Sequence, residues 1–132
     1  MYNRYVFKTD FPTYRNYILD NKIPEKYPLK ERDHALYDTP DCYSKWASIL
    51  MMFNEIKRDG MKIVDLGTGE GPLPHIIGDQ GYDVTGVDNM RVDHPFKTSL
   101  VQMVLRDAIE FLYEIEDESV DVFTDSCSVT HF

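Results

Sequence analysis

Cysteine, positive charge and long apolar runs are all scarce in this chain of 132 residues. Its two cysteines, Cys42 and Cys127, lie far apart without the spacing of metal ligands, so reduced thiols are expected and a single disulfide is the alternative. Fourteen basic residues stand against 23 acidic ones, and the net charge of −9 argues against a broad nucleic-acid-binding face. Neither a metal site built on cysteines nor nucleic acid as a partner is therefore expected.

Membrane and export signals are missing as well. No apolar run is long enough to cross a bilayer, and residues 1–8 lack the apolar centre of a signal peptide. These absences predict a cytoplasmic protein with no membrane partner. What the sequence does contain is enough material for a packed core, with 42% hydrophobic and 13% aromatic residues.

The N-terminal third shows little periodicity. Residues 1–38 are rich in tyrosine, proline and charge, and they predict an irregular N-terminal arm with one short helix after Pro12. A domain over residues 39–132 comes next. It opens with a helix that Thr39 can cap and Pro40 can begin, and an apolar stripe runs along that helix to Ile56.

From residue 61 onward, strands and helices alternate. Strands are predicted at 61–66, 82–87, 100–105 and 120–124, with helices from Pro72 to Gly78 or Gly81 and over 107–115, and an irregular loop over 89–99. This alternation is typical of an α/β fold with a parallel sheet. The strands end at a glycine-rich turn, at Asp88, before Asp107 and before Ser126, so these positions are expected at one edge of the sheet.

The glycine-rich turn is the most informative segment. Asp65 precedes three alternating glycines, Gly67, Gly69 and Gly71, which let a backbone approach a nucleotide-like ligand closely. A dinucleotide fingerprint would require glycine where Pro72 stands. The Asp65 carboxylate would also repel a pyrophosphate, whereas it suits an ammonium or sulfonium group. S-adenosylmethionine carries both of these groups and no phosphate.

Four segments together resemble the class I (Rossmann-like) S-adenosylmethionine-dependent methyltransferases. Val64-Asp-Leu-Gly-Thr-Gly-Glu-Gly71 is similar to the first family motif, and residues 85–90, 104–112 and 120–131 are similar to the second, third and fourth. The resemblance covers residues 40–132. It implies a Rossmann-like three-layer fold with strand order 3-2-1-4, S-adenosylmethionine as cofactor, and methyl transfer to an acceptor that is expected to be a small molecule. No metal is expected, because His34, His75 and His94 lack the spacing of metal ligands.

The same resemblance implies a role for each matched residue. Asp65 would orient the amino group of the cofactor, Asp88 would accept from the ribose hydroxyls, Met90 would pack on the adenine, and Asp107 with the Ala108 N–H would bind the adenine edge. Asp125 and His131 are the candidates for a general base. The full expected cofactor site is Asp65, Gly67, Thr68, Gly69, Gly71, Asp88, Asn89, Met90, Asp107, Ala108 and Ser126.

The resemblance is also incomplete, because the family fold has seven strands and this chain ends at Phe132, just after the fourth motif. A fragment or shortened form is therefore expected, with a fourth strand whose open edge could pair with a second copy. The alternative is that the N-terminal arm or another subunit covers this edge. A non-catalytic S-adenosylmethionine-binding module is an alternative function. An NAD-dependent oxidoreductase is another, which Asp65 and Pro72 disfavour. The single roles have simpler alternatives too, because the glycine turn could be only a tight connection and Asp107 only a helix cap.

Overall fold

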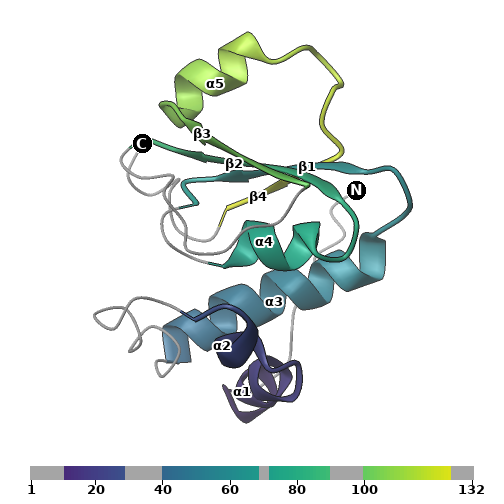
Figure 1. Cartoon of the computed structure of the whole chain (residues 1–132), viewed down its shortest axis with the longest axis vertical. Coiled ribbons are helices and arrows are strands. Elements are labelled where there is room, and N and C mark those ends of the chain that lie inside the picture. The colour runs from purple at the N-terminus through teal and green to yellow at the C-terminus, as the bar shows by residue number, and fades with distance from the viewer. Residues whose placement is uncertain (1–10, 29–39, 69–71, 90–99, 126–132) are drawn as a thin grey trace, which may run out of the picture. The chain divides into compact units, whose positions relative to one another are not determined.

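The computed structural model describes residues 11–28, 40–68, 72–89 and 100–125 (Figure 1). Its contacts divide the chain into two compact units, Met1–Ile56 and Lys57–Phe132. The first unit holds α1 (Phe11–Asp20), α2 (Ile23–Lys26) and α3 (Pro40–Ile56). The second unit holds β1 (Lys62–Leu66), α4 (Leu73–Gly78), β2 (Asp83–Asp88), β3 (Val101–Leu105), α5 (Ala108–Glu114) and β4 (Val122–Thr124).

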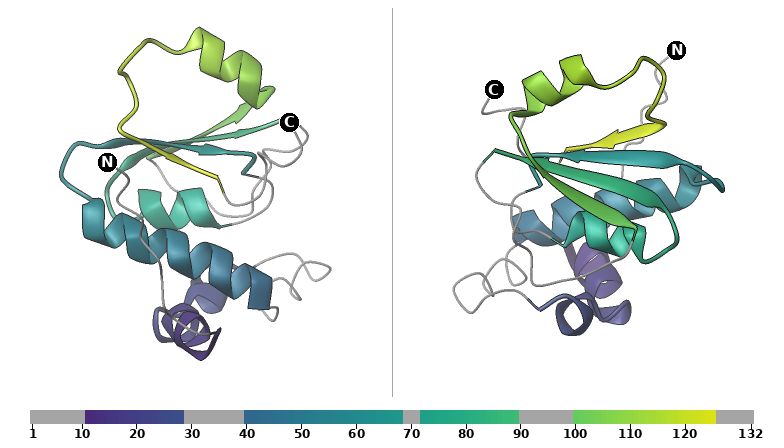
Figure 2. Two further views of the ribbon diagram at one scale, coloured as in Figure 1. Left: turned by 180° about the vertical axis from the view of Figure 1, so that it is seen from behind. Right: turned by 45° about the horizontal axis from the view of Figure 1, so that its top comes forward.

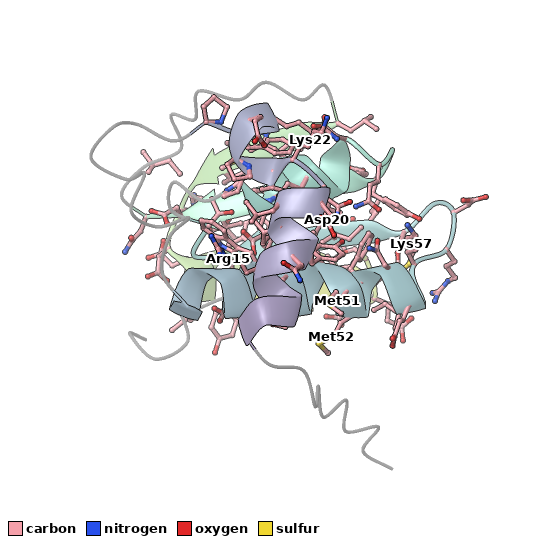
Figure 3. All side chains as sticks on the ribbon, turned by 90° about the horizontal axis from the view of Figure 1, so that it is seen from below. Arg15, Asp20, Lys22, Met51, Met52 and Lys57 are labelled. Carbon is pink, nitrogen blue, oxygen red and sulfur yellow. The ribbon has the colours of Figure 1, made fainter. Side chains whose placement is uncertain are left out.

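In the first unit, α1 runs across α3 (Figure 3). Ile18 of α1 is fully buried, and the Asn54 amide of α3 donates a hydrogen bond of 2.9 Å to the Tyr17 hydroxyl. The predicted short helix after Pro12 and the predicted helix from Pro40 are both confirmed. The single turn of α2 was not predicted, because it begins after Lys22 in a left-handed conformation that no sequence pattern indicates. The predicted separation of residues 1–38 from 39–132 stays a prediction.

The second unit is built on a four-stranded sheet in the order β3-β2-β1-β4, with every neighbouring pair parallel. This arrangement confirms the predicted α/β fold and strand order, and Figure 2 shows the four strands running in one direction. Four of the five β1 residues are buried, as a central strand of a parallel sheet requires. β4 has only three residues, against five predicted.

Helices α4 and α5 lie on opposite sides of the sheet (Figure 1). Leu73 and Ile77 give α4 a buried apolar side, and the helix ends where predicted, at Gly78. On the other side, Val64, Leu66 and Val87 of the sheet form a core cluster with Ala108 of α5. These layers agree with a Rossmann-like fold. Among the described residues, no helix combines the length and apolar character needed to cross a bilayer.

The amino ends of β1 and β4 are joined through one side chain. The Asp121 carboxylate accepts a hydrogen bond of 2.7 Å from the Lys62 backbone N–H, and the Asp121 N–H donates to the Lys62 carbonyl at 2.9 Å. Arg58 also approaches Asp121, at 3.5 Å, but its side chain is 72% exposed. Since exposed ion pairs contribute little, the bond to the backbone is expected to matter more than the ion pair.

Replacing Asp121 by alanine should lower the free energy of unfolding by about 1–2 kcal/mol, because the Lys62 N–H loses a charged acceptor. Asp121→Asn keeps an acceptor oxygen and should retain most of this stability. Arg58→Ala removes only the exposed ion pair and should change stability by less than about 0.5 kcal/mol. Urea unfolding measures all three. Equal losses in D121A and R58A would assign the effect to the ion pair instead.

Candidate functional site

The strand order places a topological switch point beside β1. From β1 the chain proceeds to β2 and β3 on one side, and it then returns to add β4 on the other side (Figure 2). In open parallel sheets, ligands bind beyond the carboxyl ends of the strands at such a point. We call the side of the sheet where the strands end the carboxyl edge.

A row of four paired residues crosses the sheet near this edge. Asp65 of β1 pairs with Gly86 of β2 on one side and with Thr124 of β4 on the other, and Gly86 pairs with Met103 of β3. Since paired residues of parallel strands project to the same face, Asp65 lies between a residue with no side chain and a small hydroxyl residue. A carboxyl group thus sits in a central strand whose other buried residues, Ile63, Val64 and Leu66, are apolar.

Two threonine hydroxyls satisfy this buried carboxyl. Asp65 is 3% exposed, and its Oδ1 accepts a hydrogen bond of 2.7 Å from the Thr124 hydroxyl. Its Oδ2 accepts from the hydroxyl of Thr68, which is also buried. We call these three residues the Asp65 cluster. Thr68 follows Gly67, and Thr124 is the last residue of β4. The cluster therefore joins the start of the glycine turn to β4, which lies on the other side of β1 from β2.

Burial also changes the acidity of this carboxyl. The pKa of Asp65 is raised from 3.8 to about 6, mainly because burial disfavours the charged form. The hydroxyls of Thr68 and Thr124 act in the opposite direction, since they donate to the carboxylate. The negative charges of Asp125 and Asp88 raise the pKa of Asp65 further, so both carboxyl groups are close enough to act on it.

The backbone around the glycine turn is shaped for close approach. Gly67 has a φ of 64°, a left-handed conformation that glycine adopts without strain, and the Thr68 N–H donates to the Val87 carbonyl of β2 at 3.1 Å. A Cβ on Gly86 would lie 2.9 Å from the Met103 sulfur and 3.2 Å from the Thr68 hydroxyl. Glycine at position 86 therefore leaves room for the Asp65 cluster.

Asp88 and Asn89 stand where β2 ends. The Asp88 carbonyl accepts a hydrogen bond of 3.0 Å from the Arg106 N–H, which holds the ends of β2 and β3 together. The Asp88 side chain is half-buried and Asn89 is exposed. Both predicted cofactor residues therefore lie at the carboxyl edge.

Asp107 is the N-cap of α5. Its Oδ1 accepts from the Ile109 N–H at 2.9 Å and from the Glu110 N–H at 3.1 Å, so the simpler alternative of a capping role is shown. Both bonds go to Oδ1, and Oδ2 takes no part in the cap. Ala108, next along the chain, is buried in the core cluster with Val64, Leu66 and Val87.

The basic side chain beside Asp107 pairs with acidic residues of α5. Arg106 lies just before Asp107, and its guanidinium pairs with Glu114 and, at 3.8 Å, with Glu110 of α5. Besides Arg106, the charged residues described at the ends of the four strands are all carboxyl groups, those of Asp65, Asp88, Asp107 and Asp125. Such an edge suits a cationic ligand better than a phosphate.

The remaining predicted site residues are Gly69, Gly71, Met90, Ser126 and His131, and they lie outside the described residues. Asp125 is half-buried directly after β4. The described residues contain no group of three or more His, Cys, Asp or Glu side chains that could hold a metal ion. Sequence reasoning missed Gly86 and Thr124, whose importance depends on the register between strands. The only signal for Thr124 was a small polar residue at the end of a predicted strand.

Comparisons of the chain with protein-family models, with curated proteins and with solved structures gave no match. A functional assignment therefore depends on the fold, the site geometry and the sequence motifs.

The unusual acidity of Asp65 predicts a dependence of stability on pH. The folded state holds the Asp65 proton more tightly than the unfolded state, so stability should fall as pH rises from about 4 to about 6. Asn is neutral at every pH and can still bond to both hydroxyls. Between pH 4.5 and pH 7.5, D65N should therefore gain about 2 kcal/mol of unfolding free energy relative to the original chain.

Denaturant unfolding across this pH range measures the difference. Asp83→Asn is the matched control, because it removes the same charge from an exposed residue at the opposite end of β2. Parallel curves of unfolding free energy against pH for D65N and the original chain, from pH 4 to pH 8, would show that the pKa of Asp65 is not raised by folding.

The cap on α5 gives a second prediction. Asp107→Ala should lower the free energy of unfolding by about 1 kcal/mol, whereas Asp107→Asn should be nearly neutral, since asparagine caps as well as aspartate. Chemical denaturation distinguishes the two variants. Full stability of D107A would show that the two N–H groups of α5 find other acceptors.

Proposed function

We propose that this chain binds S-adenosylmethionine at the carboxyl edge and transfers its methyl group to a small-molecule acceptor, as the class I methyltransferases that it resembles do. The observation that supports the proposal best is the group of carboxyls around the switch point, formed by Asp65, Asp88 and Asp125. This group makes a nucleotide with a pyrophosphate an unfavourable ligand and a nucleoside with a positive charge a favourable one.

The described residues fit the nucleoside part of such a ligand. Asp88 ends the strand next to β1, and its two carboxylate oxygens match the two neighbouring hydroxyls of a ribose. One strand further along, Asp107 offers Oδ2, which the cap does not use, as an acceptor for an exocyclic amino group. The order β1, β2, β3 thus runs from the glycine turn through a ribose acceptor to an adenine acceptor.

The glycine turn would lie against the methionine part. Gly67 and Thr68 bring the backbone into the turn, and the bond from Thr68 to Val87 fixes where it leaves the sheet. Asp65 acts on the ligand through its charge, since both of its oxygens already accept hydrogen bonds from threonine hydroxyls. Gly69, Gly71, Asn89, Met90, Ala108 and Ser126 complete the proposed binding residues by the family resemblance.

When bound, S-adenosylmethionine supplies a methyl group on a sulfonium, which is already an activated leaving group. The chain then has to hold the acceptor in line and exclude water, and positioning supplies much of the rate enhancement. A general base is needed only for an acceptor that must lose a proton. Asp125 directly follows β4 and is our candidate for this base, together with His131.

Self-association through β4 belongs to the proposal as well. β4 lies at the edge of the sheet, and its Phe123 is 46% exposed. An apolar strand with an open edge can pair with a second copy. The cytoplasmic location expected from the sequence is likewise part of the proposal.

Titration calorimetry with S-adenosylmethionine tests the binding. Asp88→Ala should weaken the affinity at least about tenfold, because the ribose hydroxyls lose a charged acceptor. Asp83→Asn, in the same strand but at its other end, should leave the affinity unchanged. No binding by a chain shown to be folded would overturn the proposal, and full affinity of D88A would overturn the role of Asp88.

Methyl transfer is tested separately, with methyl-labelled S-adenosylmethionine and a panel of small-molecule acceptors. Incorporation of label into an acceptor supports the enzyme. Binding without transfer to any acceptor would favour the non-catalytic binding module.

A further inference from the structure

The Asp65 cluster places a carboxyl group where hydrogen bonding within the core does not require one. A carboxyl buried among the apolar residues of β1 carries a desolvation cost that an apolar side chain such as valine would avoid. The chain instead provides two hydroxyl donors, one on each side of the switch point, and a glycine at 86 that makes room for one of them. This arrangement holds a charge next to the place where a ligand would lie.

We propose that the Asp65 cluster is a positioning and charge-sensing element, in which a positively charged group bound at the carboxyl edge favours the ionised form of Asp65 and thereby releases its proton to solvent. The proposal rests on the proposed function, since it deepens the role of the same edge. Asp65 acts here through Thr68 and Thr124 and through its charge, and it does not touch the ligand.

The electrostatic surroundings determine the direction of this effect. Asp65 faces the hydroxyls of Thr68 and Thr124 within the cluster, and the charges of Asp125 after β4 and Asp88 at the end of β2. Both neighbouring carboxylates disfavour ionisation of Asp65, and so does burial. A cation placed among these groups offsets the repulsion, so ligand binding and loss of the proton favour each other, as linkage requires.

A pair of probes isolates the charge of the ligand. S-adenosylmethionine carries a positive sulfonium, whereas S-adenosylhomocysteine has a neutral thioether and is otherwise the same molecule apart from the methyl group. Every group that the two share has the same effect on both dissociation constants, and the methyl group does not titrate, so the pH dependence of their ratio reports on the sulfonium charge. The preference for S-adenosylmethionine should increase about tenfold between pH 5 and pH 7.5, a typical size for coupling between sites.

The experiment measures both dissociation constants by calorimetry on the full chain from pH 5 to pH 8. At pH 6, buffers of different ionisation enthalpy should show more proton release with S-adenosylmethionine than with S-adenosylhomocysteine. Asp65→Asn should abolish the pH dependence of the ratio, while the control Asp83→Asn should retain it.

Thr124 supplies a more specific test. Thr124→Val keeps the shape of the side chain but removes a donor that stabilises the ionised Asp65 carboxyl. The pH at which the ratio of the two dissociation constants has made half of its change, its midpoint, should therefore move upward. Thr124→Ser keeps the hydroxyl and should restore the original midpoint. A residue that only packed the core would not move this midpoint. T124V and T124S also carry the test if D65N fails to fold.

The possible failures can be told apart. A ratio that is independent of pH while both probes bind would overturn this inference and leave the proposed function intact. A pH dependence that persists in D65N, or an unmoved midpoint in T124V, would also overturn the inference. Binding of neither probe at any pH would overturn the proposed function and this inference with it.

Discussion

The second unit depends on the hydrogen bonds of the buried Asp65 carboxyl, which connect β1 with β4 and with the glycine turn. They join β1 to Thr124 of β4 and to Thr68 after Gly67, so one carboxyl determines where the fourth strand ends and where the glycine turn begins. β4 has only three residues, too few for backbone pairing alone to hold it firmly. Asp121 makes a similar bond to the Lys62 N–H at the amino end. Both ends of this short strand are therefore attached to β1 by side chains.

These two attachments also protect the strand register. Shifting β4 by one residue would turn Thr124 to the opposite face of the sheet and leave the Asp65 oxygen without its donor. The same shift would move Asp121 away from the Lys62 N–H. Because a buried carboxylate without a partner is costly, the register of β4 is specified by polar contacts where its few apolar residues could not specify it.

Most of the sheet could be predicted from sequence, because its strands are short apolar runs that end at recognisable turn residues. The order 3-2-1-4 came from the family resemblance and is confirmed. The ends of elements were harder, since Val120 packs against the core cluster beside α5 without being part of β4. The pairing of Asp65 with Gly86 and Thr124 could not be predicted, because lateral register is a property of the folded sheet that no local pattern contains. The capping role of Asp107 was predictable, since it depends only on the place of this residue before a helix.

The separation of Asp65 and Thr124 by 59 positions has a consequence for the order of folding. β1 and β2 can pair as soon as α4 has formed between them, whereas β4 must wait until β2, β3 and α5 have been made. Contacts between distant residues form late because closing a long loop costs entropy. We therefore expect a chain still emerging from the ribosome to hold β1 to β3 with the Asp65 carboxyl lacking its Thr124 donor. The Asp65 cluster becomes complete only when β4 joins the sheet, so the hydrogen bond between Thr124 and Asp65 marks the addition of this strand.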